Sequence, residues 1–176
     1  MLFSIFGNLL ITPIIMTRIR LVGLYQILAM SIDRDVLDES PLLQNMSNYQ
    51  RRKAILISEL HEFEKGELLV EQDTIGRSMH LILSGEVQVI RRDANESRLL
   101  ATLKPGQIFG EVGYIRETER TADVVATKKV SALRFNYERM EKDLKFFPNI
   151  VAKLNFNISY ILGERLADMV GNSKNK

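Results

Sequence analysis

Short apolar runs separated by turn residues fill the middle of the chain, and longer amphipathic runs flank them. From His61 the spacing of apolar residues changes from a helical to a strand-like period. We expect short strands at 68–70, 79–83, 87–90, 99–103, 121–126 and 130–135. The turns between them carry glycine, aspartate or lysine, a rhythm typical of a β-sandwich or β-roll. The predicted fold is α+β but mainly β, a jelly-roll-like β-roll with helices on both sides.

Two helical segments frame this region. Ser47 has the character of an N-cap before a helix at 49–60. The predicted apolar face of that helix consists of Tyr49, Ala54, Ile57 and Leu60. After the strands, Asn136 is expected to cap a helix at 137–146.

The longest helical pattern begins at Pro148 and runs to about Val170, with Gly171 predicted as its stop and residues 172–176 as a frayed tail. Apolar residues recur in it at intervals of three and four: Ile150, Val151, Leu154, Ile158, Ile161, Leu162, Leu166 and Met169. An apolar stripe of this length is expected to be buried, either against the barrel or against a second copy of the chain.

The first seventeen residues carry no charged side chain and are rich in leucine, isoleucine and phenylalanine. A helix of this length reaches about 25 Å, less than the roughly 30 Å of a hydrocarbon core. Three interpretations remain open for residues 1–30: two apolar helices at 2–16 and 19–30 that pack on this protein or its dimer mate, attachment to a membrane or a partner, and a fragment or misread start. Arg18 and Arg20 follow the apolar run, so an inserted segment would leave the rest of the chain in the cytoplasm.

Residues 31–40 are acidic and lack strong periodicity, so we predict a linker there and a domain boundary near Ser40. The expected organisation is an apolar segment with its linker at 1–40 and one β-roll domain with its C-terminal helix at 41–176.

Composition narrows the classes of function. The 24 basic and 22 acidic residues leave a net charge of +2, which gives no electrostatic argument for nucleic acid. The absence of cysteine excludes disulfides and thiolate sites, and is compatible with a cytoplasmic location. His61 and His80 lack the spacing of metal ligands, and no catalytic arrangement stands out, so we expect neither a metal nor an enzyme.

One glycine-flanked turn does carry chemistry. Gly110 and Gly113 allow the backbone to approach a ligand closely, and the segment after them can direct N–H groups at an anion. Arg120 supplies a planar charged fork for phosphate oxygens, whereas the acceptor-only carboxylate of Glu111 suits a sugar hydroxyl. Together they predict a cradle for a small phosphate ester.

Phe109-Gly110-Glu111 followed by Arg120-Thr121-Ala122 and Val124 resembles the phosphate-binding cassette of cyclic-nucleotide-binding domains. Glycines at 66, 85, 106 and 110 fall where that family has turns, and the resemblance covers roughly residues 42–169. It implies a β-roll that binds cAMP or cGMP, with the C-terminal helix as lid and homodimer seam. The ligand-binding residues are then expected to be Phe109, Gly110, Glu111, Val112, Gly113, Arg120, Thr121, Ala122, Leu81 and Val89.

Two features leave alternatives open. Thr121 occurs at a position where threonine fits both cAMP and cGMP, so it does not choose between them. The cassette also departs from the family pattern at 115–119, where Glu117 and Glu119 weaken phosphate binding unless both face water. The alternative function is therefore a nucleotide-free dimerisation or membrane-adaptor module.

A regulator of the catabolite-activator type is disfavoured, because only six residues, 171–176, follow the long helix and a helix-turn-helix would not fit.

Overall fold

The computed structural model describes residues 34–173. The predicted apolar segments at 2–16 and 19–30 lie outside these residues, so their interpretations stay predictions. Within 34–173, no helix combines the length and the hydropathy that crossing a bilayer requires.

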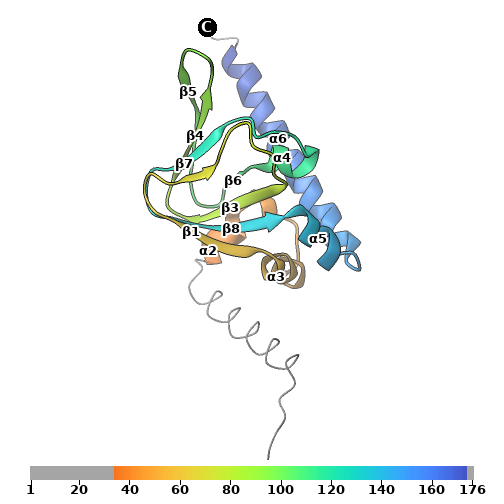
Figure 1. Ribbon diagram of the computed structural model, residues 1–176. Coiled ribbons are helices and arrows are strands. Elements are labelled where there is room, and N and C mark those ends of the chain that lie inside the picture. The colour runs from red at the N-terminus through yellow and green to blue at the C-terminus, as the bar shows by residue number, and fades with distance from the viewer. Residues whose placement is uncertain (1–33, 174–176) are drawn as a thin grey trace, which may run out of the picture. The chain divides into compact units, whose positions relative to one another are not determined.

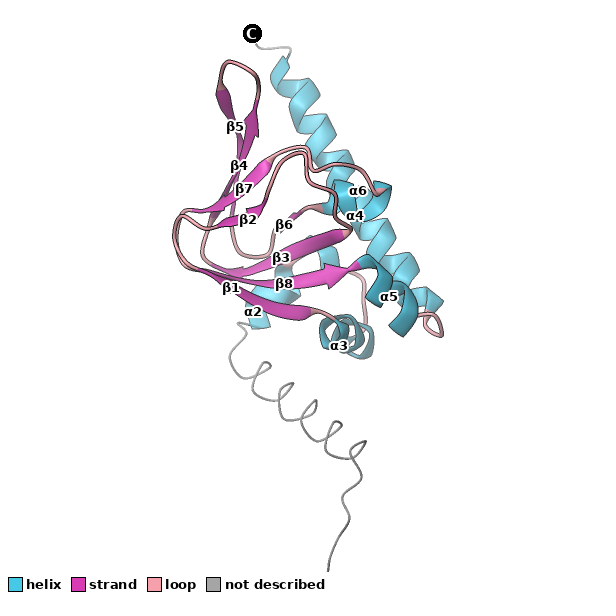
Figure 2. Cartoon of the chain, viewed as in Figure 1, coloured by secondary structure: helices cyan, strands magenta, loops and turns pink. Residues whose placement is uncertain are grey.

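The described strands form two four-stranded antiparallel sheets that face each other as a β-roll (Figures 1 and 2). The first sheet has the order β1 (Glu59–Phe63), β8 (Val130–Asn136), β3 (Ser78–Ser84), β6 (Ile108–Phe109). The second has the order β2 (Leu68–Val70), β7 (Asp123–Ala126), β4 (Val87–Arg92), β5 (Ser97–Leu103). The predicted β-roll is confirmed, and β1 and β6 are strands that the sequence pattern did not delimit.

Side chains between the two sheets form the core of the roll. Its buried members are Val70, Ile82, Val87, Leu103, Phe109, Val124, Ala126, Val130 and Ala132. Because successive residues of a strand point to opposite faces, Leu81 faces away from these residues although it is fully buried. Both faces of β3 are therefore covered, one by the second sheet and the other on the side where the helices lie (Figure 2).

A bulge interrupts the pairing of β4 with β5. Val89 pairs with Ala101 and Ile90 pairs with Leu99, so Leu100 is an extra residue on β5. Such an extra residue bends its strand and redirects a side chain, and Leu100 lines the cavity described below.

Three helices precede or follow the sheets as the sequence predicts. Helix α3 (Asn48–Ile57) begins with a reciprocal capping box between Ser47 and Gln50, and Asn136 caps α5 (Tyr137–Asp143). Helix α6 (Pro148–Ser173) continues through Gly171, so the predicted stop at that residue is wrong. Glycine is less favourable than alanine inside a helix by about 1 kcal/mol, which weakens a helix without forcing it to end.

The apolar face predicted for α3 is partly wrong. Ala54 and Ile55 are the buried residues, whereas Tyr49 is 56% exposed and Leu60 belongs to β1. Because the helix ends at Ile57, the predicted face loses its last member to the first strand.

The predicted linker contains helix α2 (Arg34–Glu39), followed by the 3-10 turn η1 (Pro41–Leu43). The hydroxyl of Ser40 is buried and donates to the carbonyl oxygen of Gly106, so this segment is anchored to the roll. The domain boundary near Ser40 stays a prediction.

Candidate nucleotide-binding site

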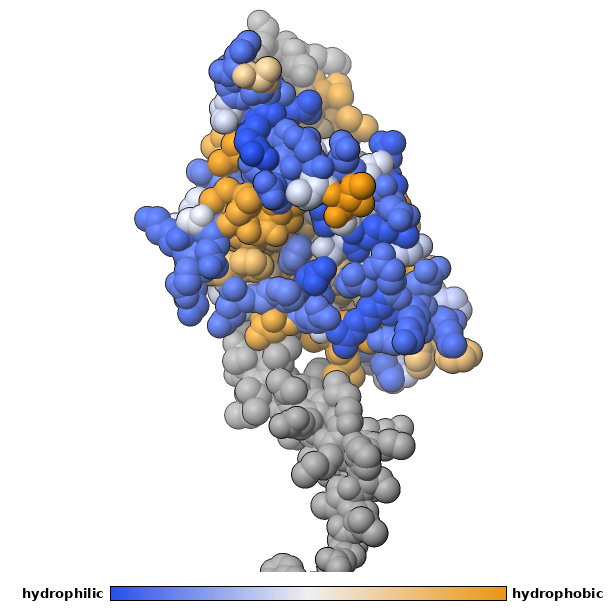
Figure 3. Space-filling view, in the orientation of Figure 1, coloured by the Kyte–Doolittle hydropathy of each residue, from blue (hydrophilic) through white to orange (hydrophobic). Residues whose placement is uncertain are grey.

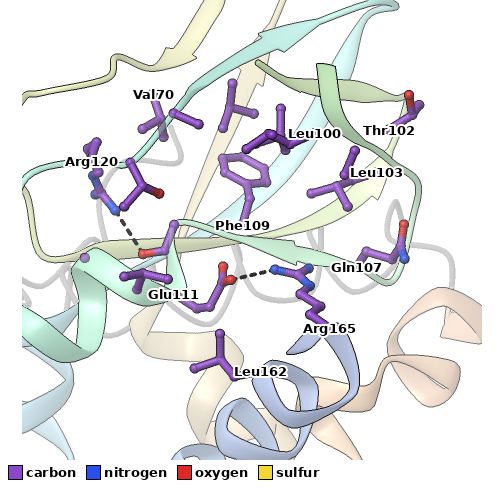
Figure 4. A pocket seen from close by; sticks show the side chains of 18 of the residues that line it. Val70, Leu100, Thr102, Leu103, Gln107, Phe109, Glu111, Arg120, Leu162 and Arg165 are labelled. Carbon is purple, nitrogen blue, oxygen red and sulfur yellow. Dashed lines mark hydrogen bonds and ion pairs between the residues drawn. The ribbon is translucent and has the colours of Figure 1, made fainter. Parts of the chain in front are cut away.

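A cavity of about 550 Å³ opens between the second sheet, the cassette and α6 (Figure 4). It contains nine of the ten predicted ligand-binding residues: Val89, Phe109, Gly110, Glu111, Val112, Gly113, Arg120, Thr121 and Ala122. Leu81 is the exception: it points to the opposite face of β3 and does not line this cavity. The remaining lining residues include Val70, Leu100, Thr102, Leu103, Gln107, Leu162, Arg165, Asp168 and Met169.

Arg120 lies at one end of this cavity in a slot formed by three glycines. Cβ atoms built on Gly76, Gly110 and Gly113 would lie 3.2, 3.0 and 2.8 Å from its guanidinium nitrogens. Gly110 has φ +79°, a left-handed conformation that favours glycine, at the N-cap of helix α4 (Glu111–Arg116). The glycine frame therefore makes room for an arginine side chain that is only 7% exposed.

Two neutral acceptors hold the guanidinium. Its Nη1 donates to the carbonyl oxygen of Gly110 at 2.9 Å, and its Nη2 donates to the hydroxyl of Ser78 at 3.0 Å. Within the described residues Arg120 forms no ion pair with a carboxylate. Burial lowers the pKa of Arg120, and the nearby guanidinium of Arg134 lowers it further, whereas Glu111 raises it. This end of the cavity is thus a buried positive charge suited to an anion.

Glu111 opens helix α4 and is equally buried, at 6% exposure. Its carboxylate accepts from Nη1 of Arg165 at 2.5 Å, and Nη2 of Arg165 donates to the carbonyl oxygen of Ile108 at 2.6 Å. Arg165 belongs to α6, so its hydrogen bonds connect the C-terminal helix to the cassette (Figure 4). A carboxylate has about four acceptor positions, which leaves Glu111 able to accept from a ligand hydroxyl as well.

The acids that depart from the family pattern do not crowd Arg120. Glu117 pairs with Arg77 at 3.2 Å, and its side chain is 65% exposed. Glu119 is also exposed. Arg77 in turn stacks on Tyr137, with its guanidinium carbon 3.4 Å from the ring centre. The condition that both acids face water is therefore met.

Tyr114 of α4 meets Tyr137 edge to face at 5.4 Å, and burial raises the pKa of Tyr114 to about 12. The cassette helix is therefore packed directly against the start of α5 by aromatic contacts.

His80 packs behind Phe109, one of the residues that line the cavity. Its ring stacks on Phe109 with 4.7 Å between ring centres, and it is 4% exposed. Burial, with help from Arg134 and Arg120, lowers the pKa of His80 to about 3, so the ring is neutral at physiological pH. No group of histidine and acidic residues within the described residues is arranged to hold a metal ion.

Sequence reasoning missed four residues that build the site: Gly76, Ser78, Leu162 and Arg165. Gly76 lies in the turn between the strands expected at 68–70 and 79–83, and Leu162 was predicted only as a member of the apolar stripe. Arg165 gave a weak signal, as a basic residue inside the stripe region of the long helix. Ser78 gave none.

Comparison with known proteins agrees with this geometry. Residues 60–145 match the family described as "Cyclic nucleotide-binding domain". The chain is 32% identical over 101 residues to a cAMP-dependent protein kinase regulatory subunit of Schizosaccharomyces pombe, a match that covers 57% of this chain and 24% of that protein. It is 26% identical over 130 residues to the cyclic AMP receptor protein of Thermus thermophilus, covering 73% of this chain and 58% of that protein.

The crystal structure of the Thermus thermophilus catabolite activator protein superposes with a TM-score of 0.68 at 25% identity, covering 77% of this chain and 62% of that chain. The chain thus spans about a quarter of the kinase regulatory subunit that it matches and somewhat over half of the receptor protein. The chain carries a cyclic nucleotide-binding domain, related to those of catabolite activator proteins and of protein kinase A regulatory subunits.

Proposed function

We propose that this chain is a regulatory sensor that binds a cyclic nucleotide, cAMP or cGMP, in the β-roll. The observation that carries the proposal is that a buried guanidinium, Arg120, and a buried carboxylate, Glu111, both lie on the wall of one cavity. A cavity of about 550 Å³ falls in the range of sites that enclose a small ligand, roughly 300 to 1,000 Å³. The relatives reported above are named for cAMP, which supports the same ligand class here.

In this proposal the cyclic phosphate binds at Arg120. The guanidinium has donors beyond the two that Gly110 and Ser78 accept, and the first N–H groups of α4 have no intrahelical acceptor. A phosphate would supply both with a partner and neutralise the buried charge. The ribose hydroxyl then donates to Glu111, and the base extends along the apolar lining of Val89, Leu100 and Leu162.

Isothermal titration with cAMP and cGMP tests this proposal, with Arg120→Ala as the diagnostic variant. Loss of one partner of a desolvated charge pair costs about 2 to 5 kcal/mol, which is at least about thirtyfold in Kd. The matched control is Arg116→Ala, an exposed arginine of the neighbouring helix α4 that does not line the cavity. Saturable heat with the wild type and with Arg116→Ala, but not with Arg120→Ala, is expected. No heat with either nucleotide, with circular dichroism showing the fold intact, would reject ligand binding.

We propose further that α6 couples the site to a homodimer. On its outward side the helix presents Phe156, Tyr160, Gly163, Ala167 and Val170, at alternating steps of three and four, without a charged residue among them. Phe156 is 66% exposed and Tyr160 58%, and clustered apolar exposure of this kind is typical of an interaction surface. Apolar residues also appear along the C-terminal half of this helix in Figure 3. A second copy of the same face would cover the stripe as in a coiled coil.

Analytical ultracentrifugation tests the dimer with Phe156→Glu. The substitution places a charge in the seam and should shift the protein to monomer at micromolar concentration. Asn155→Glu, on the adjacent exposed position but off the stripe, should leave the dimer unchanged. A dimer that persists in a protein giving no heat with either nucleotide would instead favour the nucleotide-free dimerisation module.

A further inference from the structure

The slot that holds Arg120 has two walls, which come from different parts of the chain. One wall is the segment that leads into β3, where Gly76 lies against the guanidinium and Ser78 accepts a hydrogen bond from it. The same segment holds the backbone of Arg120, whose N–H donates to the carbonyl oxygen of Thr74 at 2.8 Å. The other wall is the start of α4, where a Cβ built on Gly113 would lie 2.9 Å from the carbonyl oxygen of Gly76. The separation of the two walls therefore sets where the guanidinium lies.

Arg77 joins these two walls from outside the cavity. It stands between Gly76 and Ser78 in the sequence, and its Nη1 lies 3.2 Å from Oε2 of Glu117, the C-cap of α4. The backbone N–H of Glu117 in turn donates to the carbonyl oxygen of Gly113 at 3.2 Å. Arg77 itself is not among the residues that line the cavity. Its side chain therefore connects the first wall of the slot to the helix that forms the second.

The start of α5 holds Arg77 in this position. The guanidinium carbon lies 3.4 Å from the centre of the Tyr137 ring, and the carbonyl oxygen of Arg77 accepts from the N–H of Tyr137 at 2.9 Å. A guanidinium over an aromatic face is attracted by the ring. The ring of Tyr137 also meets Tyr114 of α4 at 5.4 Å, and the side chain of Arg77 is only 20% exposed. Arg77 is therefore fixed by contacts with two helices.

The backbone at Glu117 is unusual for its residue type. Its φ of +50° lies in the left-handed region, which favours glycine and is uncommon for a glutamate. Such a conformation persists where the surrounding contacts hold it, and the ion pair with Arg77 is one of these contacts. The acid at 117 thus has a structural partner on the opposite wall of the slot.

We propose that Arg77 is a positioning residue of the nucleotide site. Through Glu117 and Tyr137 it holds the end of α4 against the start of β3, and so keeps the slot at the width in which Arg120 faces the cavity. Nucleotide affinity then depends on a side chain that does not touch the ligand. This inference rests on the proposed function, because its readout is the binding of a cyclic nucleotide, and it adds a determinant of affinity outside the cavity.

The test measures Kd for cAMP and for cGMP with the wild type, Arg77→Ala, Arg77→Lys and the control Arg139→Ala. The alanine variant removes the ion pair and the ring contact, and should weaken binding about fivefold. The lysine variant keeps a cation that can reach both partners, and should recover most of that loss. Arg139 is also a partly exposed arginine, but its ion pairs are with Glu59 of β1 and Asp143 of α5. Its variant should therefore bind like the wild type.

A double variant separates positioning from a general loss of stability. Arg77→Ala and Glu117→Gln each break the same ion pair, so the two together should weaken binding by no more than Arg77→Ala alone. Thermal melts identify a temperature at which every variant is folded, and Kd is measured there. Under these conditions a variant that is merely less stable keeps the wild-type Kd.

The outcomes separate the two proposals. A wild type that binds a nucleotide, together with an Arg77→Ala variant of equal affinity, overturns the role of Arg77 and leaves the proposed function in place. Losses that add in the double variant, or equal losses with alanine and lysine, also overturn it, because Arg77 would then not act as a cation through Glu117. A wild type that binds neither nucleotide overturns the proposed function and this inference with it.

Discussion

The two ends of the cavity are held in different ways. At one end, Arg120 lies among three glycines and is held by hydrogen bonds to Gly110 and Ser78, all inside the roll. At the other end, the lining comes from the C-terminal half of α6, where Met169 is 63% exposed and Arg165 provides the hydrogen bonds to the cassette. The first end is built into the core, whereas the second is formed by the exposed half of a helix, which Arg165 joins to the cassette.

The same contrast divides α6 along its length. In the first half, Ile150, Leu154 and Ile158 are almost fully buried, and Asn157 donates to the carbonyl oxygens of Leu42 and Gln44 at 2.8 and 2.9 Å. From Leu162 to Gly171 no residue of the helix is buried. We infer that the end of the cavity that holds Arg120 is rigid, while the exposed half of α6 opens more readily than its buried half.

The largest expected effect is a loss of stability on substitution in the buried half of α6. Ile158→Ala opens a cavity in the buried half of α6 and should lower the free energy of unfolding by about 2 to 5 kcal/mol. Leu162→Ala, at a half-buried position in the next turn of the helix, should cost about 1 kcal/mol or less. Urea denaturation measures both. Equal losses would show that the two halves are equally anchored.

The next effect concerns the glycine slot. Gly113→Ala places a Cβ 2.8 Å from Nη1 of Arg120 and 2.9 Å from the carbonyl oxygen of Gly76, so the guanidinium must shift. Overpacking of this kind costs about 1 to 3 kcal/mol, and we expect nucleotide affinity to fall by about tenfold or more. Gly171→Ala, which meets nothing within 4 Å, is the matched control and should bind like the wild type. Unchanged titration curves for both variants would show that the glycine slot does not contribute to nucleotide binding.

The pH dependence of stability tests whether the buried ring of His80 stays neutral. The folded pKa of His80 is about 3, below the unfolded value of about 6.5, so the unfolded state binds more protons between them. Stability is therefore complete above pH 6.5 and falls as the pH drops toward 3, by about 2 kcal/mol at pH 5. His80→Phe should remove this component from urea midpoints at pH 7 and 5, whereas His61→Phe should keep it. Equal pH dependence of the wild type and His80→Phe would contradict the neutral buried ring.

The smallest effect tests the contacts that Arg165 makes from α6 to the cassette. Arg165→Ala removes both contacts to the cassette, and amide hydrogens from about Leu162 to Gly171 should exchange roughly fivefold faster, equivalent to about 1 kcal/mol. Amides of residues 150–158 serve as the internal control and should be unaffected. Faster exchange along the whole helix would instead mean that Arg165 anchors all of α6.

Much of the site was predictable because it is local in sequence. The strand rhythm, the caps at Ser47 and Asn136, and the pair Glu111 and Arg120 lie within short windows whose residue types carry their own chemistry. On the surface, apolar residues gather where β2 and β7 cross the roll, and polar residues surround them (Figure 3).

What the sequence by itself determined is therefore the β-roll and the chemistry of the cassette. Only the tertiary structure decided which face of β3 looks inward, which excludes Leu81, and which distant groups complete the site. Ser78 is 42 residues from Arg120 and Arg165 is 54 from Glu111 in the chain. Such contacts depend on how β3 and α6 are placed against the cassette, and that placement follows from the packing of the whole domain and not from any local pattern of residues.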